Sequence, residues 1–214
     1  MSDGDFKTYF HERAGRFSSF YRSEPVSRVL GRGPLFDRLR IAVVTAEALG
    51  AKRALDVGCG SGPLFAPLAS VGIHVTGIDP ADGMVALARE AAAAFPDMVD
   101  VEQRGWEQID EVGAYDIAIA LGVFDYVGGP ADLLGRMGRA APHVVASFPY
   151  PGLRTNLRKA RYGARGVDVH GYPPDGFDAL AAAAGMRVAL LTPLGTAGAL
   201  VHFARADDGE RPAA

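Results

Sequence analysis

Short apolar runs alternate with amphipathic segments of helical period along most of this chain, and this alternation constrains the fold more than any other feature. Runs with strand character lie at 53–58, 74–79, 99–105, 115–122 and 143–149. Segments with helical spacing lie at 35–49, 63–72, 81–95, 131–141 and 175–185. Strands that alternate with helices predict βαβ units and a parallel sheet covered on both faces.

The end of the chain breaks this pattern. Two strand-like runs, 187–195 and 198–206, are separated by only a few residues, which predicts an antiparallel hairpin. The predicted fold is therefore α/β: a Rossmann-like, seven-stranded, mostly parallel sheet with an antiparallel C-terminal hairpin. Residues 1–206 are expected to form a single domain, and 207–214 to form a disordered tail.

Composition narrows the function classes. A net charge of −3 gives no overall field that favours nucleic acid or an anionic membrane. No run reaches the roughly 18 uncharged apolar residues of a membrane span, and no signal peptide is expected. The single cysteine, Cys59, excludes an intrachain disulfide and favours the cytoplasm. One cysteine and five scattered histidines offer no metal-ligand spacing.

A glycine-rich turn follows the first strand-like run, in the sequence LDVGCGSG. Asp56 precedes three glycines, at 58, 60 and 62, and glycines let a ligand approach the backbone closely. The spacing differs from the G-x-G-x-x-G of NAD enzymes. Asp79 ends the next strand-like run, where an acid is placed to accept hydrogen bonds from a ribose diol.

These residues resemble the class I S-adenosylmethionine-dependent methyltransferases of small-molecule type. LDVGCGSG is similar to the first motif of that family, VTGIDPADGMVALARE to the second, and YDIAIALGVFDYV to the fourth strand with its following loop. The resemblance covers roughly residues 49–205. It implies S-adenosylmethionine as the cofactor and methyl transfer as the reaction.

The resemblance also implies which residues hold the cofactor. Those expected from the matched motifs are Asp56, Gly58, Gly60, Gly62, Asp79, Pro80, Met84 and Leu121. Asp79 would bind the ribose diol, Met84 would pass near adenine, and Leu121 would line the cofactor beyond the fourth strand.

One position departs from the family pattern. Gly105 stands where the family usually has an aspartate that holds the adenine amino group. We expect Trp106 to cover the adenine face and Glu107 to replace the missing acceptor. The alternative for Trp106 is a place in the core.

The acceptor pocket is expected from three segments: the N-terminal helices, the loop GVFDYVGGP and a later basic insertion. Residues 1–48 carry aromatic residues at helical spacing and are interpreted as a helical lid. Within it, Tyr9 is a candidate substrate contact, and by the resemblance Tyr21 would reach the carboxylate of the cofactor, with simple core packing as the alternative. Asp125 and Tyr126 stand where many relatives have a histidine, so either is a candidate base or hydrogen-bond partner. Asp125 has the alternative of capping the following helix.

An insertion at 152–172 forms the third candidate part of this pocket. Its basic residues include Arg154, Arg158 and Arg161, which would pair with an anionic group of the acceptor; the alternative is a solvated helix face. Tyr172 is a candidate substrate contact. His170 has a route to a catalytic role, with a surface position as its alternative.

The predicted function is transfer of a methyl group from S-adenosylmethionine to an oxygen or nitrogen of a small, anionic, specialised metabolite. The protein would be a monomer or homodimer without nucleic-acid or membrane partners. SFPYP, at 147–151, resembles the motif of amino-directed DNA methyltransferases but follows the wrong strand and lacks its Asn or Asp. The alternatives are a non-methylating enzyme of this fold (cyclisation, rearrangement or decarboxylation) and a non-catalytic cofactor-binding subunit.

Overall fold

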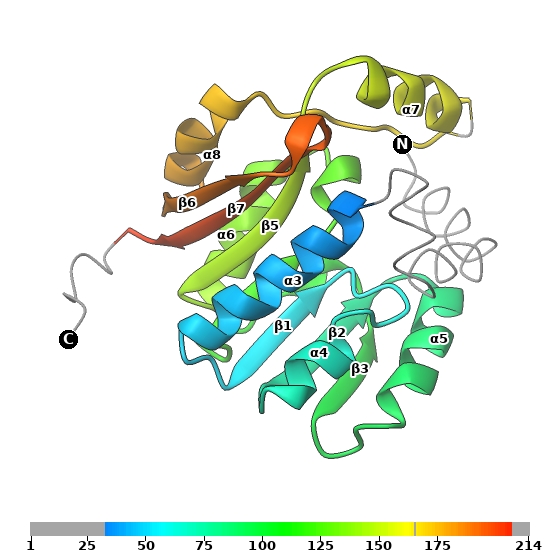
Figure 1. The fold of residues 1–214 in the computed structure, drawn as a ribbon, viewed down its shortest axis with the longest axis vertical. Helices are drawn as coiled ribbons and strands as arrows, with labels where there is room; N and C mark the ends of the chain where they lie inside the picture. The colour runs from blue at the N-terminus through cyan, green and yellow to red at the C-terminus, as the bar shows by residue number, and fades with distance from the viewer. Residues whose placement is uncertain (1–32, 165, 207–214) are drawn as a thin grey trace.

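A computed structural model describes residues 33–164 and 166–206, which form one seven-stranded sheet (Figure 1). The strands are β1 (Arg53–Val57), β2 (His74–Asp79), β3 (Val99–Gln103), β4 (Ile117–Ala120), β5 (His143–Pro149), β6 (Met186–Pro193) and β7 (Gly198–Arg205). They lie in the order β3-β2-β1-β4-β5-β7-β6. The first five are parallel, and β7 is antiparallel to both of its neighbours. The predicted fold class is confirmed.

Helices cover both faces of the sheet (Figure 1). The helices are α3 (Gly33–Ala48), α4 (Phe65–Ser70), α5 (Asp82–Ala92), α6 (Pro130–Ala140), α7 (Leu153–Gly163) and α8 (Phe177–Ala183). Alternate residues of a strand point to opposite faces. In β1, Leu55 and Val57 therefore join the core with α6 and α8, whereas Ala54 joins the core with α3, α4 and α5. None of these helices has the length and apolar character needed to cross a bilayer.

The segment predicted as a lid is described only from residue 33 onward. There, α3 packs Ala42 and Ala46 fully buried against the sheet. Tyr9 and Tyr21 lie outside the described residues, as does the tail at 207–214, so their roles stay predictions.

The insertion at 152–172 crosses the carboxyl end of the sheet. It begins with α7 and continues as a segment without regular structure, in which Val167 and Val169 are buried. The His170 amide donates to the Asp125 carbonyl at 2.8 Å, and the Tyr172 amide donates to the Pro149 carbonyl at 2.8 Å. These bonds fasten the returning chain to the loop after β4 and to the end of β5.

A histidine pair on β5 and β7 makes stability depend on pH. His202 Nε2 lies 3.2 Å from His143 Nδ1. Burial, His143 and Arg187 lower the pKa of His202 from 6.5 to about 4. Below pH 6.5 the unfolded chain therefore binds a proton there that the folded protein does not bind. We expect the free energy of unfolding to fall as the pH drops from 6.5 toward 4, and His202→Gln to flatten this slope in urea titrations across that range.

Candidate functional site

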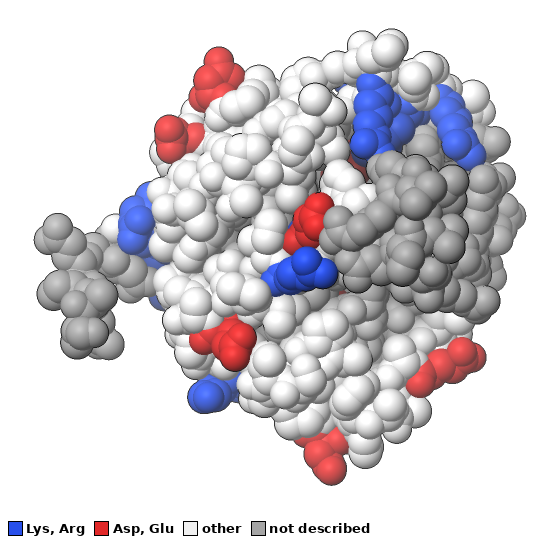
Figure 2. All heavy atoms as spheres, in the orientation of Figure 1, with Lys and Arg blue, Asp and Glu red and all other residues white. Residues whose placement is uncertain are grey.

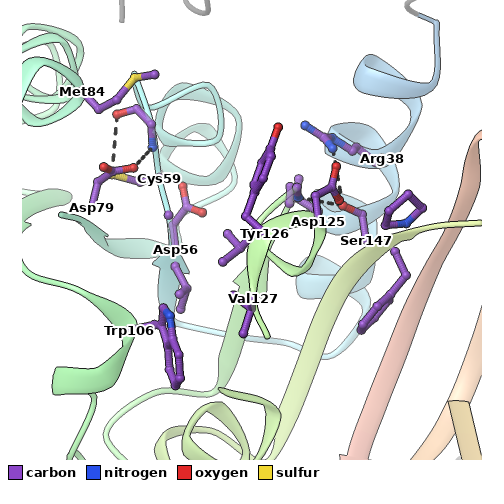
Figure 3. Close-up of a pocket in the computed structure, with 18 of the residues that line it drawn as sticks. Arg38, Asp56, Cys59, Asp79, Met84, Trp106, Asp125, Tyr126, Val127 and Ser147 are labelled. Carbon is purple, nitrogen blue, oxygen red and sulfur yellow. Dashed lines mark hydrogen bonds between the residues drawn. The ribbon is translucent and has the colours of Figure 1, made fainter. Parts of the chain in front are cut away.

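A cavity of about 970 Å³ opens at the carboxyl ends of β1, β2, β4 and β5. Strand order reverses between β1 and β4, and open α/β sheets bind ligands at such a point. Asp79 and Met84 lie toward one side of the cavity, Arg38, Asp125 and Ser147 toward the other, with Asp56 between them (Figure 3).

Gly58, Gly60 and Gly62, which follow β1, all have positive φ angles, but their surroundings differ. A Cβ on Gly58 would lie 2.5 Å from Cγ2 of Val123, and one on Gly62 would lie 2.4 Å from Cδ2 of Phe65. A Cβ on Gly60 would meet no atom within 4 Å, and Gly60 lines the cavity. Gly60 therefore opens the backbone to a ligand, whereas Gly62 does not line the cavity and permits packing beneath it.

Asp79 is held rigidly at the end of β2. Its Oδ2 accepts a hydrogen bond from the Gly60 amide at 3.1 Å, and its Oδ1 accepts one from the Ala81 amide at 2.9 Å. Burial raises its pKa, while the two amides act to lower it. Each carboxylate oxygen retains further acceptor capacity, so Asp79 can receive both hydroxyls of a diol.

Asp56 is a buried carboxyl group that lines the cavity, with 3% of the residue exposed. Burial and the nearby charge of Asp79 raise its pKa to about 7. Among the described residues, its Oδ2 has no hydrogen-bond partner. Buried polar atoms are nearly always paired, so a donor on a bound ligand would complete this group.

In the region after β3, the side chain of Glu107 lies beside Gly105. Oε2 of Glu107 lies only 2.5 Å from the point where a Cβ on Gly105 would stand. The Glu107 carboxylate thus occupies space next to residue 105, where the family pattern places an acid. Trp106 lines the cavity and also packs against the core. Its position is therefore compatible both with a contact to adenine and with a place in the core. Met84 and Pro80 also line the cavity. Of these two residues, Met84 is buried.

Arg38 and Ser147 are among the cavity-lining residues that the sequence analysis did not predict. The Ser147 Oγ accepts a hydrogen bond from the Gly122 amide at 2.8 Å and lies 3.4 Å from Nη1 of Arg38. Leu121, a predicted cofactor contact and the residue before Gly122 in the chain, also lines the cavity. Arg38 gave no signal because a basic residue in an amphipathic helix normally faces solvent, and Ser147 lies within an ordinary strand pattern.

Asp125 and Arg158 form an ion pair at the other side of the cavity. Nη2 of Arg158 lies 2.7 Å from Oδ2 of Asp125 and 3.0 Å from the hydroxyl of Tyr126. Cζ of Arg158 lies 5.7 Å from the ring centre of Tyr126 and 5.9 Å from that of Tyr162. Burial lowers the pKa of Arg158, but the charge of Asp125 outweighs it and raises the pKa above its usual value. Asp125 does not cap α6, whose N-cap is Gly129 without a side-chain cap.

Removal of this ion pair tests its contribution. Arg158→Met leaves the Asp125 carboxylate, 11% exposed, without its charged partner. We expect the free energy of unfolding at pH 7 to fall by about 2 kcal/mol. The double variant with Asp125→Asn should recover at least half of that loss in urea titrations. If the double variant loses as much as the single one, packing of the Arg158 side chain matters instead of its charge.

The remaining predicted residues divide between the cavity and its supports. Arg154 lines the cavity, but Arg161, His170 and Tyr172 do not. The Tyr172 hydroxyl donates to the Phe124 carbonyl at 3.0 Å, so it fastens the loop after β4. No histidine is among the described residues that line the cavity, and no group of three potential metal ligands occurs among them.

Comparisons with known proteins agree with this geometry. A family profile described as a methyltransferase domain matches residues 55–142, which include the glycine turn, Asp79 and the loop after β4. Residues 55–142 therefore match a methyltransferase domain. This match supports the class I S-adenosylmethionine-dependent methyltransferase family that the sequence predicted.

Curated relatives of this chain include ubiquinone biosynthesis O-methyltransferases. That of Azorhizobium caulinodans is 30% identical over 125 residues, which are 58% of this chain and 49% of the relative. That of Burkholderia multivorans is 36% identical over 106 residues, 47% of this chain and 46% of the relative. The chain spans about half the length of the curated relatives that it matches.

Solved structures share the fold of this chain at low sequence identity. Magnesium protoporphyrin IX methyltransferase from Synechocystis, with bound S-adenosylhomocysteine, has a TM-score of 0.77 at 19% identity, covering 96% of this chain and 100% of that chain. Human N-acetylserotonin methyltransferase has a TM-score of 0.64 at 18% identity, covering 88% and 58%. These similarities support the fold and leave the acceptor open.

Proposed function

We propose that this protein transfers the methyl group of S-adenosylmethionine to an oxygen or nitrogen atom of a small acceptor that carries an anionic group. The carrying observation is the Asp79 carboxylate, fixed by the Gly60 and Ala81 amides beside an open glycine turn. A fixed carboxylate that can accept hydrogen bonds from two hydroxyls, next to backbone without side chains, fits the ribose of a nucleoside cofactor.

The residues of the cavity fit the whole cofactor. Asp79 would hold the ribose diol, and Met84, Trp106 and Glu107 would surround adenine. Asp56 Oδ2, which has no partner among the described residues, would accept a hydrogen bond from the amino group of the methionine portion. Arg38 would bind its carboxylate. When bound, the cofactor supplies a methyl group already activated by a sulfonium.

The opposite side of the cavity would hold the acceptor. Arg154 lines it and offers the paired N–H groups that match a carboxylate or phosphate. Tyr126 and Tyr162 add aromatic surface, and the Arg158–Asp125 ion pair fixes the loop after β4 relative to α7. Alignment of the acceptor atom with the methyl group would provide much of the rate enhancement.

The proton of a hydroxyl acceptor needs a destination. Asp125 is the carboxylate on the acceptor side, and we assign it the role of base, oriented by Arg158. Tyr126 is less suited to this role, because burial and the charge of Asp125 raise the pKa of its hydroxyl above the usual value. An acceptor that arrives as a phenolate or a neutral amine needs no base.

The test is transfer of radiolabelled methyl from S-adenosylmethionine to paired acceptors. Each pair consists of a carboxylated phenol or amine and its methyl ester. The proposal expects S-adenosylhomocysteine as a product and a preference for the carboxylate, which Arg154→Gln reduces. Turnover without this preference would contradict the anionic acceptor alone, whereas consumption of the cofactor without methylated product would favour a non-methylating reaction.

A further inference from the structure

α7 presents its polar face to the cavity and an apolar stripe to solvent, the reverse of an ordinary amphipathic helix. Thr155, Arg158 and Tyr162 recur at helical spacing and line the cavity. Leu153 and Leu157, four residues apart, are 78% and 63% exposed. Residues four apart share one face of a helix, so the two leucines form one exposed stripe.

Basic residues flank this stripe. Lys159 and Arg161 are exposed and do not line the cavity, and residues 150–167 contain no Asp or Glu. In the space-filling view, Lys and Arg side chains gather over α7 at the upper right (Figure 2). The surface of α7 therefore combines exposed leucines with a local positive charge, although the whole chain has a net charge of −3.

We infer that α7 docks on the surface of an anionic lipid bilayer, with Leu153 and Leu157 inserted between headgroups and with Lys159 and Arg161 beside lipid phosphates. Leucines that alternate with basic residues on an exposed helix are the composition of interfacial helices. The charge of α7 complements anionic lipid, which attracts each nearby cation.

The size of the surface favours lipid over a protein partner. α7 has 11 residues, and its exposed apolar stripe consists of two leucines. A stable protein interface buries about 800 Å² on each partner, far more than this stripe offers. Two leucines and two cations suffice for weak, reversible binding to a bilayer. Docking would place the cavity, on the inner side of α7, next to the lipid, where acceptors with an apolar portion accumulate.

Vesicle flotation with the full chain tests this inference. Vesicles of phosphatidylcholine mixed with phosphatidylglycerol should carry the protein upward, and added salt should release it. The double variant Leu153→Ser/Leu157→Ser should bind about thirtyfold more weakly, since it loses two apolar side chains. Lys159→Gln should bind about fivefold more weakly.

Val112→Ser is the matched control, because Val112 is also 78% exposed but lies in the loop before β4. It should bind vesicles like the unchanged protein. The double variant should keep its unfolding midpoint and its affinity for S-adenosylhomocysteine, since neither leucine lines the cavity. This inference does not depend on the acceptor proposed above.

Three results would overturn the inference: no binding to the anionic vesicles, equal binding to phosphatidylcholine alone, or equal loss of binding in Val112→Ser. Light scattering of the double variant provides a fourth test. If the leucine substitutions convert an oligomer into a monomer without changing flotation, the stripe is an interface with a second copy of the chain.

Discussion

Asp79→Asn should weaken binding of S-adenosylmethionine and S-adenosylhomocysteine by about a hundredfold, because each hydrogen bond to a charged group contributes about 1.5–3 kcal/mol. The amide keeps the shape of the side chain but lacks the charge and one of the two acceptor atoms. Both carboxylate oxygens of Asp79 already accept backbone amides, so the variant also loosens the glycine turn. Isothermal titration calorimetry measures the change.

The control is Asp82→Asn, three residues along the chain. Asp82 is exposed in the first turn of α5 and does not line the cavity, so its substitution should leave both affinities unchanged. Because one backbone amide loses its acceptor, unfolding in urea should show Asp79→Asn about 1–3 kcal/mol less stable than the unchanged protein. Equal affinities for Asp79→Asn and the unchanged protein, in a folded sample, would contradict the assignment of the ribose site.

Gly62→Ala and Gly60→Ala should separate stability from binding. Both glycines have positive φ, +75° and +56°, so both alanines carry backbone strain of about 1 kcal/mol. A Cβ at 62 would additionally enter the fully buried ring of Phe65, so we expect a total loss of at least about 3 kcal/mol. A Cβ at 60 meets only open space, and its cost should remain near the strain alone.

The binding effects should run in the opposite order. A methyl group on residue 60 would occupy the space that the bare backbone offers to a ligand, so Gly60→Ala should lose at least about tenfold in cofactor affinity. Gly62→Ala, measured where it is folded, should lose less, because residue 62 does not line the cavity. Urea unfolding and calorimetry on the same samples provide both numbers. Equal affinity losses for the two variants would mean that the turn acts only as a folded unit.

The cofactor side of the site could be predicted from sequence because its determinants are local. Asp56 and Asp79 each lie at or near the end of a parallel strand, and parallel strands bring their carboxyl ends to one edge of the sheet. The roles assigned to these residues remain predictions, but their common position in the cavity followed from strand order alone.

The acceptor side depends on contacts between distant segments. Arg158 meets Asp125 across 33 positions, and Arg38 meets Ser147 across 109. The sequence made Asp125 a candidate base or hydrogen-bond partner, with a helix cap as the alternative, and it gave Arg38 no role. Neither of the two contacts could be predicted, because neither has a local pattern. His170 and Tyr172 follow α7 and contact the loop after β4. The Tyr172 hydroxyl donates a hydrogen bond to the main-chain carbonyl of Phe124 in that loop.

The sequence by itself determined the sheet, its antiparallel edge and the glycine turn, since periodicity and strand ends are properties of short segments. Only the tertiary structure decided which face of α7 meets the cavity and which meets solvent. Helical spacing places Leu153 with Leu157 and Thr155 with Arg158, but it does not say which side is covered. That choice follows from the Arg158–Asp125 pair and the Thr155 hydroxyl, which donates to the Tyr150 carbonyl at 2.6 Å and holds the polar side of α7 against the sheet.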